Sequence, residues 1–205
     1  MSKIELDEQL LIAKGGERAC YLHPEDATKV IKVLYSSTPT HNNQNQLEYI
    51  YMNYLKKRNA NLTYVTDCYG YVQTSLGQGL VFDRALDYNG EPSKSFRYMV
   101  AYKKLDLTQQ KALIMQLKAY LEQELILFVD TSLTNLYCQE IQKGEYRLLI
   151  VDGLGSKRMG FKFWMYRNFK SYTKYKIKRQ WTKFMRMYEK DVKRAQLGER
   201  PFTRL

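Results

Sequence analysis

Residues 130–135 read Asp-Thr-Ser-Leu-Thr-Asn, and residues 151–155 read Val-Asp-Gly-Leu-Gly after a strand-like run. An aspartate followed five residues later by an asparagine can place a carboxylate near an acceptor hydroxyl and an amide on a metal ion. A second aspartate that leaves a hydrophobic strand for a glycine turn can hold the magnesium that bridges nucleotide phosphates. The order and spacing of the two motifs therefore indicate a phosphoryl-transfer site.

The chain before these motifs predicts short antiparallel strands and one helix. The predicted strands lie within residues 10–22, 28–34, 64–71 and 79–82. The first range has two apolar runs around Gly15-Gly16, which predicts a hairpin, and Pro24 marks the next turn. Residues 41–46 are polar and rich in asparagine, which predicts a loop or a ragged helix start. Residues 47–55 have apolar side chains at helical spacing, and we expect a helix there.

The second half of the chain predicts a long helix and a hairpin around the two motifs. Apolar residues recur on one face from residue 107 to residue 128, which predicts an amphipathic helix that ends at the first motif. Residues 136–138 and 146–151 then predict a hairpin. Such a hairpin would bring Asn135 and Asp152 to the same rim.

Positive charge is concentrated near the C-terminal end. The chain has 33 Lys and Arg against 21 Asp and Glu, a formal net charge of +12, and residues 157–194 carry only two acids, Glu189 and Asp191. This excess indicates an anionic partner, which could be nucleic acid, an acidic membrane surface or a phosphorylated saccharide. The tail from Phe161 onward predicts a basic amphipathic helix rich in aromatic residues, whose apolar stripe is either packed core or part of a binding surface.

The composition predicts a globular protein that stays in the cytoplasm. The length of 205 residues fits one domain or two small lobes that share a cleft, and 44% of the residues are hydrophobic. We expect no signal peptide, because acidic residues interrupt the apolar stretch 4–11, and no apolar run long enough to cross a bilayer. The three widely spaced cysteines predict buried reduced thiols.

Four short stretches resemble a known family. They are Cys-Tyr-Leu-His-Pro-Glu-Asp-Ala at residues 20–27, Val-Ile-Lys-Val at 30–33, Ser-Leu-Thr-Asn-Leu at 132–136 and Lys-Arg-Gln-Trp at 178–181. With the order of the predicted elements, they resemble the YrbL family, also called the PhoP regulatory network protein family, which is related to lipopolysaccharide core kinases. The resemblance implies an α+β class and a minimal two-lobed protein-kinase-like fold. Its N-lobe, residues 1–86, would hold an antiparallel sheet and one helix, and residues 87–205 would form a reduced, mostly helical C-lobe.

The resemblance implies a nucleotide site in the N-lobe. Gly15 and Gly16 would form the loop over the phosphates of ATP, and Lys32 would contact those phosphates as a catalytic residue. Glu48 would pair with Lys32, because a flexible lysine ammonium needs a partner to orient it. The alternatives are a solvent-facing strand lysine and an ordinary helix-surface acid.

The resemblance also implies roles for the two motifs. Asp130 would act as the catalytic base, while Asn135 and Asp152 would bind magnesium. The alternatives are a loop acid after a helix for Asp130, a turn-forming amide for Asn135 and a turn-starting acid for Asp152.

Departures from kinase patterns favour an acceptor other than protein. The glycine loop retains two glycines where kinases usually have three spaced ones, so backbone contacts to phosphate are expected to be looser or absent. Val129 replaces the arginine that often precedes the catalytic aspartate, which argues against control by activation-loop phosphorylation. An Ala-Pro-Glu motif is missing, and with it most of the platform that holds a peptide.

Three functions follow from these observations. The first is an ATP- and magnesium-dependent phosphotransferase that acts on a saccharide, such as a lipopolysaccharide core sugar, with the basic tail near the inner-membrane surface. The second is a pseudokinase-like regulatory protein that binds a partner in a PhoP-type envelope-stress network. The third, a nucleic-acid-binding module, fits the net charge but leaves Asp130, Asn135 and Asp152 without a role.

Overall fold

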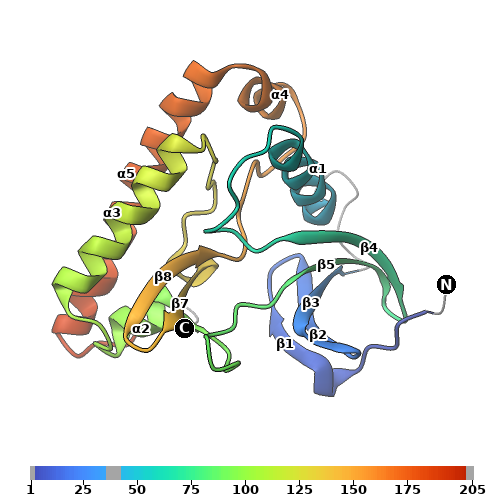
Figure 1. The fold of residues 1–205 in the computed structure, drawn as a ribbon, viewed down its shortest axis with the longest axis horizontal. Helices are drawn as coiled ribbons and strands as arrows, with labels where there is room; N and C mark the ends of the chain where they lie inside the picture. The colour runs from blue at the N-terminus through green and yellow to red at the C-terminus, as the bar shows by residue number, and fades with distance from the viewer. Residues whose placement is uncertain (1–2, 36–42, 202–205) are drawn as a thin grey trace.

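The computed structural model describes residues 3–35 and 43–201. Within these ranges the chain forms an N-lobe built on a five-stranded antiparallel sheet and a mostly helical C-lobe (Figure 1). The two lobes are connected by the segment after residue 83, which follows the last N-lobe strand along the chain. The α+β class and the two-lobed organisation agree with the expectation from the sequence.

The N-lobe sheet has the strand order β1-β2-β3-β5-β4, and every neighbouring pair is antiparallel. A short 3-10 helix, η1 (Glu8–Leu10), precedes it. The strands are β1 (Leu11–Lys14), β2 (Arg18–His23), β3 (Asp26–Leu34), β4 (Cys68–Thr74) and β5 (Gly77–Asp83). The predicted hairpin around the glycine pair is formed by β1 and β2. In the next pair, Cys20 of β2 lies opposite Lys32 of β3, so both side chains emerge on one face.

The strand expected at 64–71 begins four residues later, because the first part of this stretch pairs with the C-lobe. Ile150 N donates to Tyr64 O at 2.8 Å, and Thr66 N donates to Ile150 O at 3.0 Å. Val65 forms a parallel bridge with Ile150. This segment therefore attaches the N-lobe to the strand that precedes the second motif.

The single N-lobe helix, α1 (Gln44–Lys57), is capped by Asn43, whose side chain accepts a hydrogen bond from Gln46 N at 2.9 Å. Leu47 and Leu55 are buried on its inner face. The helix confirms the expectation for 47–55 and includes the last part of the stretch 41–46. Residues 41 and 42 lie outside the described residues.

The C-lobe combines helices with a small second sheet of order β6-β7-β8. Its strands are β6 (Lys94–Ser95), β7 (Leu136–Gln142) and β8 (Glu145–Ile150), and the short 3-10 helix η3 (Leu133–Asn135) leads into β7. The helices are α2 (Phe96–Ala101), α3 (Leu107–Gln123), α4 (Phe161–Asn168) and α5 (Lys170–Gln196). The predicted hairpin is present as β7 and β8, whereas β6 and α2 were not expected.

The helix predicted over 107–128 ends five residues early. Its start is fixed by a capping box between Asp106 and Gln109, and its end is followed by Leu125 with φ 49°. The next three residues, 126–128, lie outside the helix and are fully or almost fully buried, and Phe128 forms an isolated β-bridge with Leu154. Phe128 therefore joins the core from a strand-like segment, which explains why its helical spacing was misleading.

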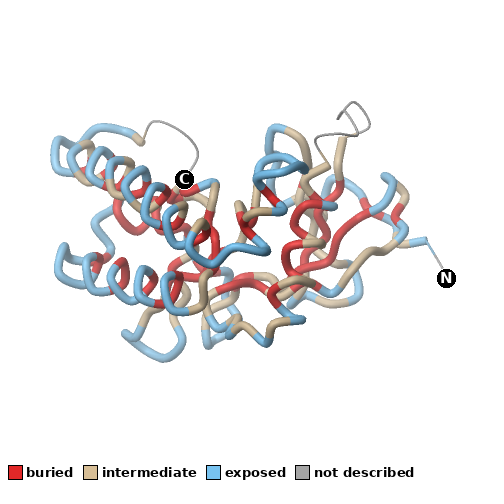
Figure 2. The backbone as a smooth tube through the Cα atoms, turned by 90° about the horizontal axis from the view of Figure 1, so that it is seen from above, coloured by how far each residue is buried: buried red, intermediate tan, exposed pale blue. Residues whose placement is uncertain are grey.

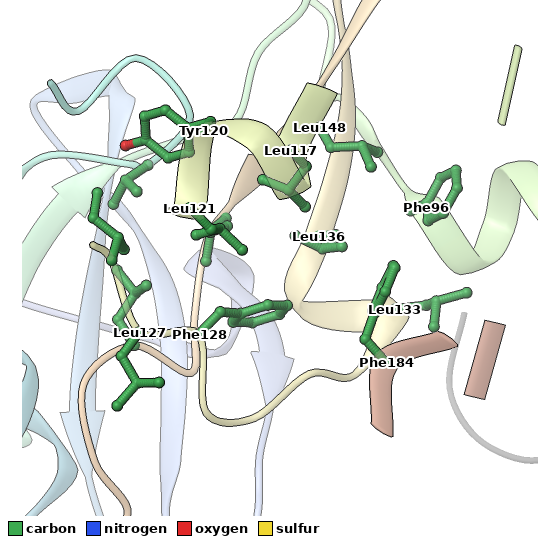
Figure 3. Close-up of a cluster of buried hydrophobic side chains, with 14 of the residues drawn as sticks. Phe96, Leu117, Tyr120, Leu121, Leu127, Phe128, Leu133, Leu136, Leu148 and Phe184 are labelled. Carbon is green, nitrogen blue, oxygen red and sulfur yellow. The ribbon is translucent and has the colours of Figure 1, made fainter. Parts of the chain in front are cut away.

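The core of the C-lobe lies between α3, α5 and the second sheet (Figures 1 and 3). The labelled side chains in Figure 3 that fill it include Phe96, Leu117, Leu121, Leu136, Leu148 and Phe184. Figure 2 shows buried positions gathered between the two long helices and exposed positions on their outer sides.

The basic tail forms two helices, α4 and α5, and not one. Ile177, Phe184 and Tyr188 are buried, so the apolar stripe of α5 is packed core. A buried ion pair adds to this packing, since Arg97 Nε of α2 lies 2.8 Å from Asp191 Oδ2. Most of the lysines and arginines of α5 remain on the outer surface.

Candidate functional site

Lys32 of β3 and Glu48 of α1 face each other in the buried interior of the N-lobe. Lys32 Nζ lies 3.4 Å from Glu48 Oε2 and donates a hydrogen bond to Val151 O at 2.8 Å. The ammonium also lies 4.3 Å from the centre of the Phe82 ring. Both side chains are more than nine-tenths buried, so the structure places Lys32 away from the solvent-facing position of the alternative interpretation.

Arg18 is a site residue that sequence reasoning missed. Its Nη2 lies 2.8 Å from Glu48 Oε1 and 2.6 Å from Asp152 Oδ1, and its Nη1 donates to Asn45 Oδ1 at 2.9 Å. Asn45 in turn donates to Lys32 O at 2.8 Å. The sequence signal for Arg18 is its spacing of two residues from Cys20, which puts both side chains on one face of a strand, but the register that sets Cys20 opposite Lys32 appears only in the structure.

Two cations and two carboxylates therefore share one small volume. Asp152 Oδ2 lies 3.8 Å from Lys32 Nζ, in addition to its contact with Arg18. Burial alone would raise the pKa of Asp152, but attraction by Arg18 and then by Lys32 outweighs burial and holds this pKa far below its ordinary value. Asp152 is thus an ionised carboxylate that still exposes 37% of its side chain to the cleft.

The first motif forms a compact loop that orients its own asparagine. Asn135 Nδ2 donates to Asp130 O at 2.9 Å and to Asp130 Oδ2 at 3.0 Å. Among the described residues, none donates a hydrogen bond to Asn135 Oδ1, so this oxygen is available to a ligand. Asp130 exposes 55% of its side chain, and its Oδ1 lies 3.7 Å from the exposed Lys157 Nζ.

Gly153 holds the two motifs together. Its φ is 83°, and a Cβ at this position would lie 2.8 Å from Asp130 Cβ and 2.9 Å from Asp130 O. Gly153 O also accepts hydrogen bonds from Val129 N at 2.8 Å and Asp130 N at 3.1 Å. Only a residue without a side chain lets the loop of Asp152 approach the loop of Asp130 this closely.

Tyr51 connects α1 to both motifs. Its hydroxyl accepts a hydrogen bond from Leu127 N at 2.8 Å. A Cβ on Gly155, whose φ is 78°, would lie 2.7 Å from Tyr51 Cγ, and Gly155 N donates to Leu127 O at 2.8 Å. The helix that supplies Glu48 is therefore positioned by the same backbone segments that position Asp130 and Asp152.

Two adjoining cavities share the site. One of about 410 Å³ has a mainly apolar wall that includes Val30, Phe82 and Ala85, together with Lys32. The other, of about 490 Å³, is lined by the predicted residues Gly15, Gly16, Asp130, Asn135 and Asp152, and by Arg18, which was not predicted. Gly15, Arg18, Asn135 and Asp152 line both. The structure thus gathers the predicted residues at one cleft, with Glu48 buried behind it.

A third cavity of about 730 Å³ lies next to the second one, between the segment after Asp152 and helices α4 and α5. Asp130 lines both of these cavities, as do residues 156–158. The expected catalytic base therefore lies at the shared edge of two hollows.

The donor set at the cleft fits magnesium. An ionised Asp152 and the free Oδ1 of Asn135 are oxygen ligands, which magnesium prefers, and it commonly completes its coordination with phosphate oxygens and water. The described residues contain no group of three or more His, Cys, Asp or Glu side chains suited to a metal, so an all-protein cage is not formed by this part of the chain. Arg18 occupies one oxygen of Asp152 and leaves the other facing Lys32.

Comparisons with known proteins identify the family of this chain. The model of the family described as "PhoP regulatory network protein YrbL" matches residues 4–189. This chain belongs to the YrbL family. It is 30% identical over 159 residues to "Uncharacterized protein YrbL" of Escherichia coli (strain K12), which covers 76% of this chain and 75% of that protein. The YrbL protein of Shigella flexneri has the same identity and coverage. The family expected from the sequence is therefore confirmed.

The kinase-like fold of this YrbL-family chain is also shown by a solved structure. The crystal structure of Rad53 1-466 in complex with AMP-PNP superimposes with a TM-score of 0.56 and 11% sequence identity, covering 97% of this chain and 53% of that chain. This chain thus spans about half of the length of the solved one. At such low identity, the likeness concerns the fold alone. Among the described residues, no helix is long and apolar enough to cross a membrane.

Proposed function

We propose that this YrbL-family protein is an ATP- and magnesium-dependent phosphotransferase that acts on a hydroxyl of a saccharide, such as a lipopolysaccharide core sugar. The observation that carries this proposal is the convergence of Lys32, Asp152 and the Asp130–Asn135 loop on one cleft. Strongly perturbed ionisable groups in a cleft are typical of functional sites. Here, the perturbed Asp152 lies beside two cations that can bind phosphate, Arg18 and Lys32.

Each part of the cleft has a role in this proposal. The apolar cavity of about 410 Å³ takes the base of the nucleotide, and the polar cavity takes its phosphates. Lys32, oriented by Glu48 and Val151 O, contacts the phosphates, and Asn135 and Asp152 hold magnesium. Magnesium, when bound, neutralises charge on the phosphate oxygens.

Asp130 receives the proton in the transfer step. The hydroxyl oxygen of the acceptor forms a bond to the γ-phosphorus of ATP, and the bond between that phosphorus and the bridging oxygen breaks. The hydroxyl proton passes to Asp130 Oδ, and ADP leaves with the bond's electron pair. The exposure of Asp130 at the edge of the cleft fits contact with an incoming acceptor.

One observation favours a second candidate function, the pseudokinase-like regulatory protein of a PhoP-type network. Arg18 Nη2 contacts Asp152 Oδ1 at 2.6 Å, so the protein supplies its own cation at the carboxylate expected to bind metal. A protein of this kind would bind its partner without phosphate transfer. The nucleic-acid-binding function gains no support from this cleft.

Nucleotide binding tests the proposal without relying on activity. We expect AMP-PNP with magnesium to raise the melting temperature of the wild type, equivalent to about 2.7 kcal/mol at a ligand concentration of roughly 100 times Kd. The Asp152→Asn variant should lose most of this shift, and Glu25→Gln, which changes an exposed acid outside the cleft, should keep it. A wild type that is not stabilised by AMP-PNP and magnesium would contradict the phosphotransferase.

Phosphate transfer from labelled ATP to a saccharide distinguishes the two candidate functions. Asp130→Asn should abolish transfer and retain the AMP-PNP shift, because Asp130 lies at the edge of the cleft. Nucleotide binding without transfer to a panel of phosphorylated saccharides would favour the regulatory function.

A further inference from the structure

The cavity of about 730 Å³ beside Asp130 is strongly basic. Its wall contains Lys162 of α4 and Lys176 and Lys183 of α5, together with Lys157 and Arg158 from the segment after Asp152. Three separate elements therefore direct cations into one hollow. A concave site lined by one sign of charge concentrates ligands of the opposite sign.

The three helical lysines of this pocket have no acidic partner in the described part of the chain. No carboxylate there lies within 4.0 Å of the ammonium of Lys162, Lys176 or Lys183. Burial, followed by repulsion from Arg179, Lys183 and Lys162, lowers the pKa of Lys176. The fold holds like charges together without neutralising them, and an anionic ligand would remove this cost.

Gln180 adds a second and independent signal. It lies one turn after Lys176 on α5, is 5% exposed and lines the same pocket. Its Oε1 is buried and accepts no hydrogen bond from the described residues. A buried carbonyl oxygen without a donor is costly, and a ligand hydroxyl would satisfy it.

The apolar part of the wall includes two aromatic side chains, Phe161 and Tyr166. Tyr166 is buried, with its ring 5.9 Å from Lys176 Nζ, and Phe161 exposes 71% of its surface at the rim. Phe161 stacks on Trp164 with ring centres 5.6 Å apart. Ligand pockets commonly combine such apolar walls with a few polar groups that fix orientation.

We propose that this pocket is the acceptor subsite, and that it takes a saccharide that already carries a phosphate. Lys176 and Lys183 bind the phosphate, Gln180 Oε1 accepts a hydrogen bond from a hydroxyl, and another hydroxyl faces Asp130 at the shared edge. This assignment rests on the proposed function, because it uses the nucleotide cleft on the other side of Asp130. The ligand is either a free sugar phosphate or the phosphorylated sugar headgroup of a lipid.

Binding without nucleotide or magnesium tests the subsite. Isothermal titration with glucose 6-phosphate, glucose and inorganic phosphate should show binding of both phosphates and little binding of glucose. Lys176→Met and Lys183→Met should each weaken phosphate binding about tenfold, the usual size for loss of one charge-assisted hydrogen bond. Lys178→Met is the matched control, since it removes the same charge from the outer surface of α5 and should change affinity less than about twofold.

Gln180→Met tests the hydroxyl contact. This substitution removes the buried amide at similar volume. It should weaken the binding of glucose 6-phosphate about fivefold and leave the binding of inorganic phosphate unchanged. Equal effects on both probes would overturn the role of Gln180. An equal loss of phosphate affinity in Lys178→Met and Lys176→Met would overturn the subsite. Binding would then depend on the overall positive charge of α5 and not on the pocket.

Vesicles distinguish the two sources of the ligand. If glucose 6-phosphate does not bind, vesicles of phosphatidylcholine containing a phosphorylated glycolipid should bind and lose binding in Lys176→Met but not in Lys178→Met. Absence of binding to both glucose 6-phosphate and the vesicles would overturn the subsite.

AMP-PNP binding separates the subsite from the proposed function, and it should be unchanged in the same variants. A normal melting-temperature shift with AMP-PNP but no anion binding refutes the subsite alone. Anion binding without any nucleotide shift would refute the phosphotransferase.

Discussion

The interlobe cleft and the basic pocket differ in how the protein treats its charges. In the cleft, Arg18 and Lys32 are paired with Glu48 and Asp152 at 2.6–3.8 Å. In the pocket, the lysines of α4 and α5 are held near one another without a carboxylate partner among the described residues. Charges that are paired internally contribute to the native geometry, whereas unpaired charges of one sign in a hollow attract a ligand of the opposite sign.

The cleft and the basic pocket therefore differ in what holds their charged side chains in place. The cleft is preorganised, because Arg18, Lys32 and Asp152 are held by contacts within the fold before a ligand arrives. The pocket stores unfavourable repulsion that binding can release. Substitutions should therefore affect stability most in the cleft and ligand affinity most in the pocket.

The largest effect on stability is expected for Glu48→Ala. Loss of this carboxylate leaves Arg18 and Lys32 with only the partly exposed Asp152, so the free energy of unfolding should fall by about 3–5 kcal/mol. Urea denaturation measures this change. The control is Glu122→Ala, which removes an exposed pair with Lys118 and should cost less than about 0.5 kcal/mol. Similar losses in both variants would show that the buried cluster is no more important for stability than a surface pair.

An intermediate effect is expected for Gly153→Ala, at the junction of the two regions. An alanine here must adopt a left-handed backbone, and its Cβ would clash with Asp130. Together these effects should cost about 2–4 kcal/mol and displace the loop of Asp130. Gly144 has a similar φ of 79°, and a Cβ added there would meet no atom within 4 Å. Gly144→Ala therefore measures the cost of the left-handed backbone alone, about 1–2 kcal/mol. Thermal or urea unfolding of the two variants gives the difference. Equal losses would mean that contact with Asp130 is unimportant.

The smallest effect, and one of opposite sign, is expected for Lys176→Met in the pocket. The pKa of Lys176 is lowered in the folded state, so its charged form destabilises the fold at neutral pH, and the penalty disappears as pH rises past the ordinary lysine value of about 10.4. The variant should thus be more stable than the wild type by roughly a few tenths of a kcal/mol at pH 7 and equal to it above about pH 10.4. Lys178→Met should show no such gain. If Lys176→Met were less stable than the wild type at pH 7, the charge of Lys176 would not be an uncompensated cost in the pocket.

Much of the fold could be predicted from the sequence, because its signals are local. Alternating strands, the glycine pair and the helix over 47–55 depend on nearby residues, and all are present in the structure. The end of α3 could not be predicted this way, since Phe128 is buried by a bridge to Leu154 far along the chain. The same reason explains the late start of β4, where the preceding segment pairs with Ile150.

The residues of the candidate site were predicted only where they belong to a short motif or to the family resemblance. Asp130, Asn135 and Asp152 belong to short patterns, and Lys32 and Glu48 came with the family resemblance. Arg18 belongs to no such pattern, and its role depends on contacts with two other elements, α1 and the loop after β8. The basic pocket likewise forms from α4, α5 and that loop, so a linear count of charges could show its sign but not its shape.

The hydrogen bond from Leu127 N to Tyr51 and the contact of Gly155 with the same ring bear on control of the site. An outward swing of α1 that separates Glu48 from Lys32 would leave Leu127 N without its partner and open a void over Gly155. The position of Glu48 beside Lys32 is therefore coupled to the packing of Tyr51 on the backbone before Asp130 and after Asp152.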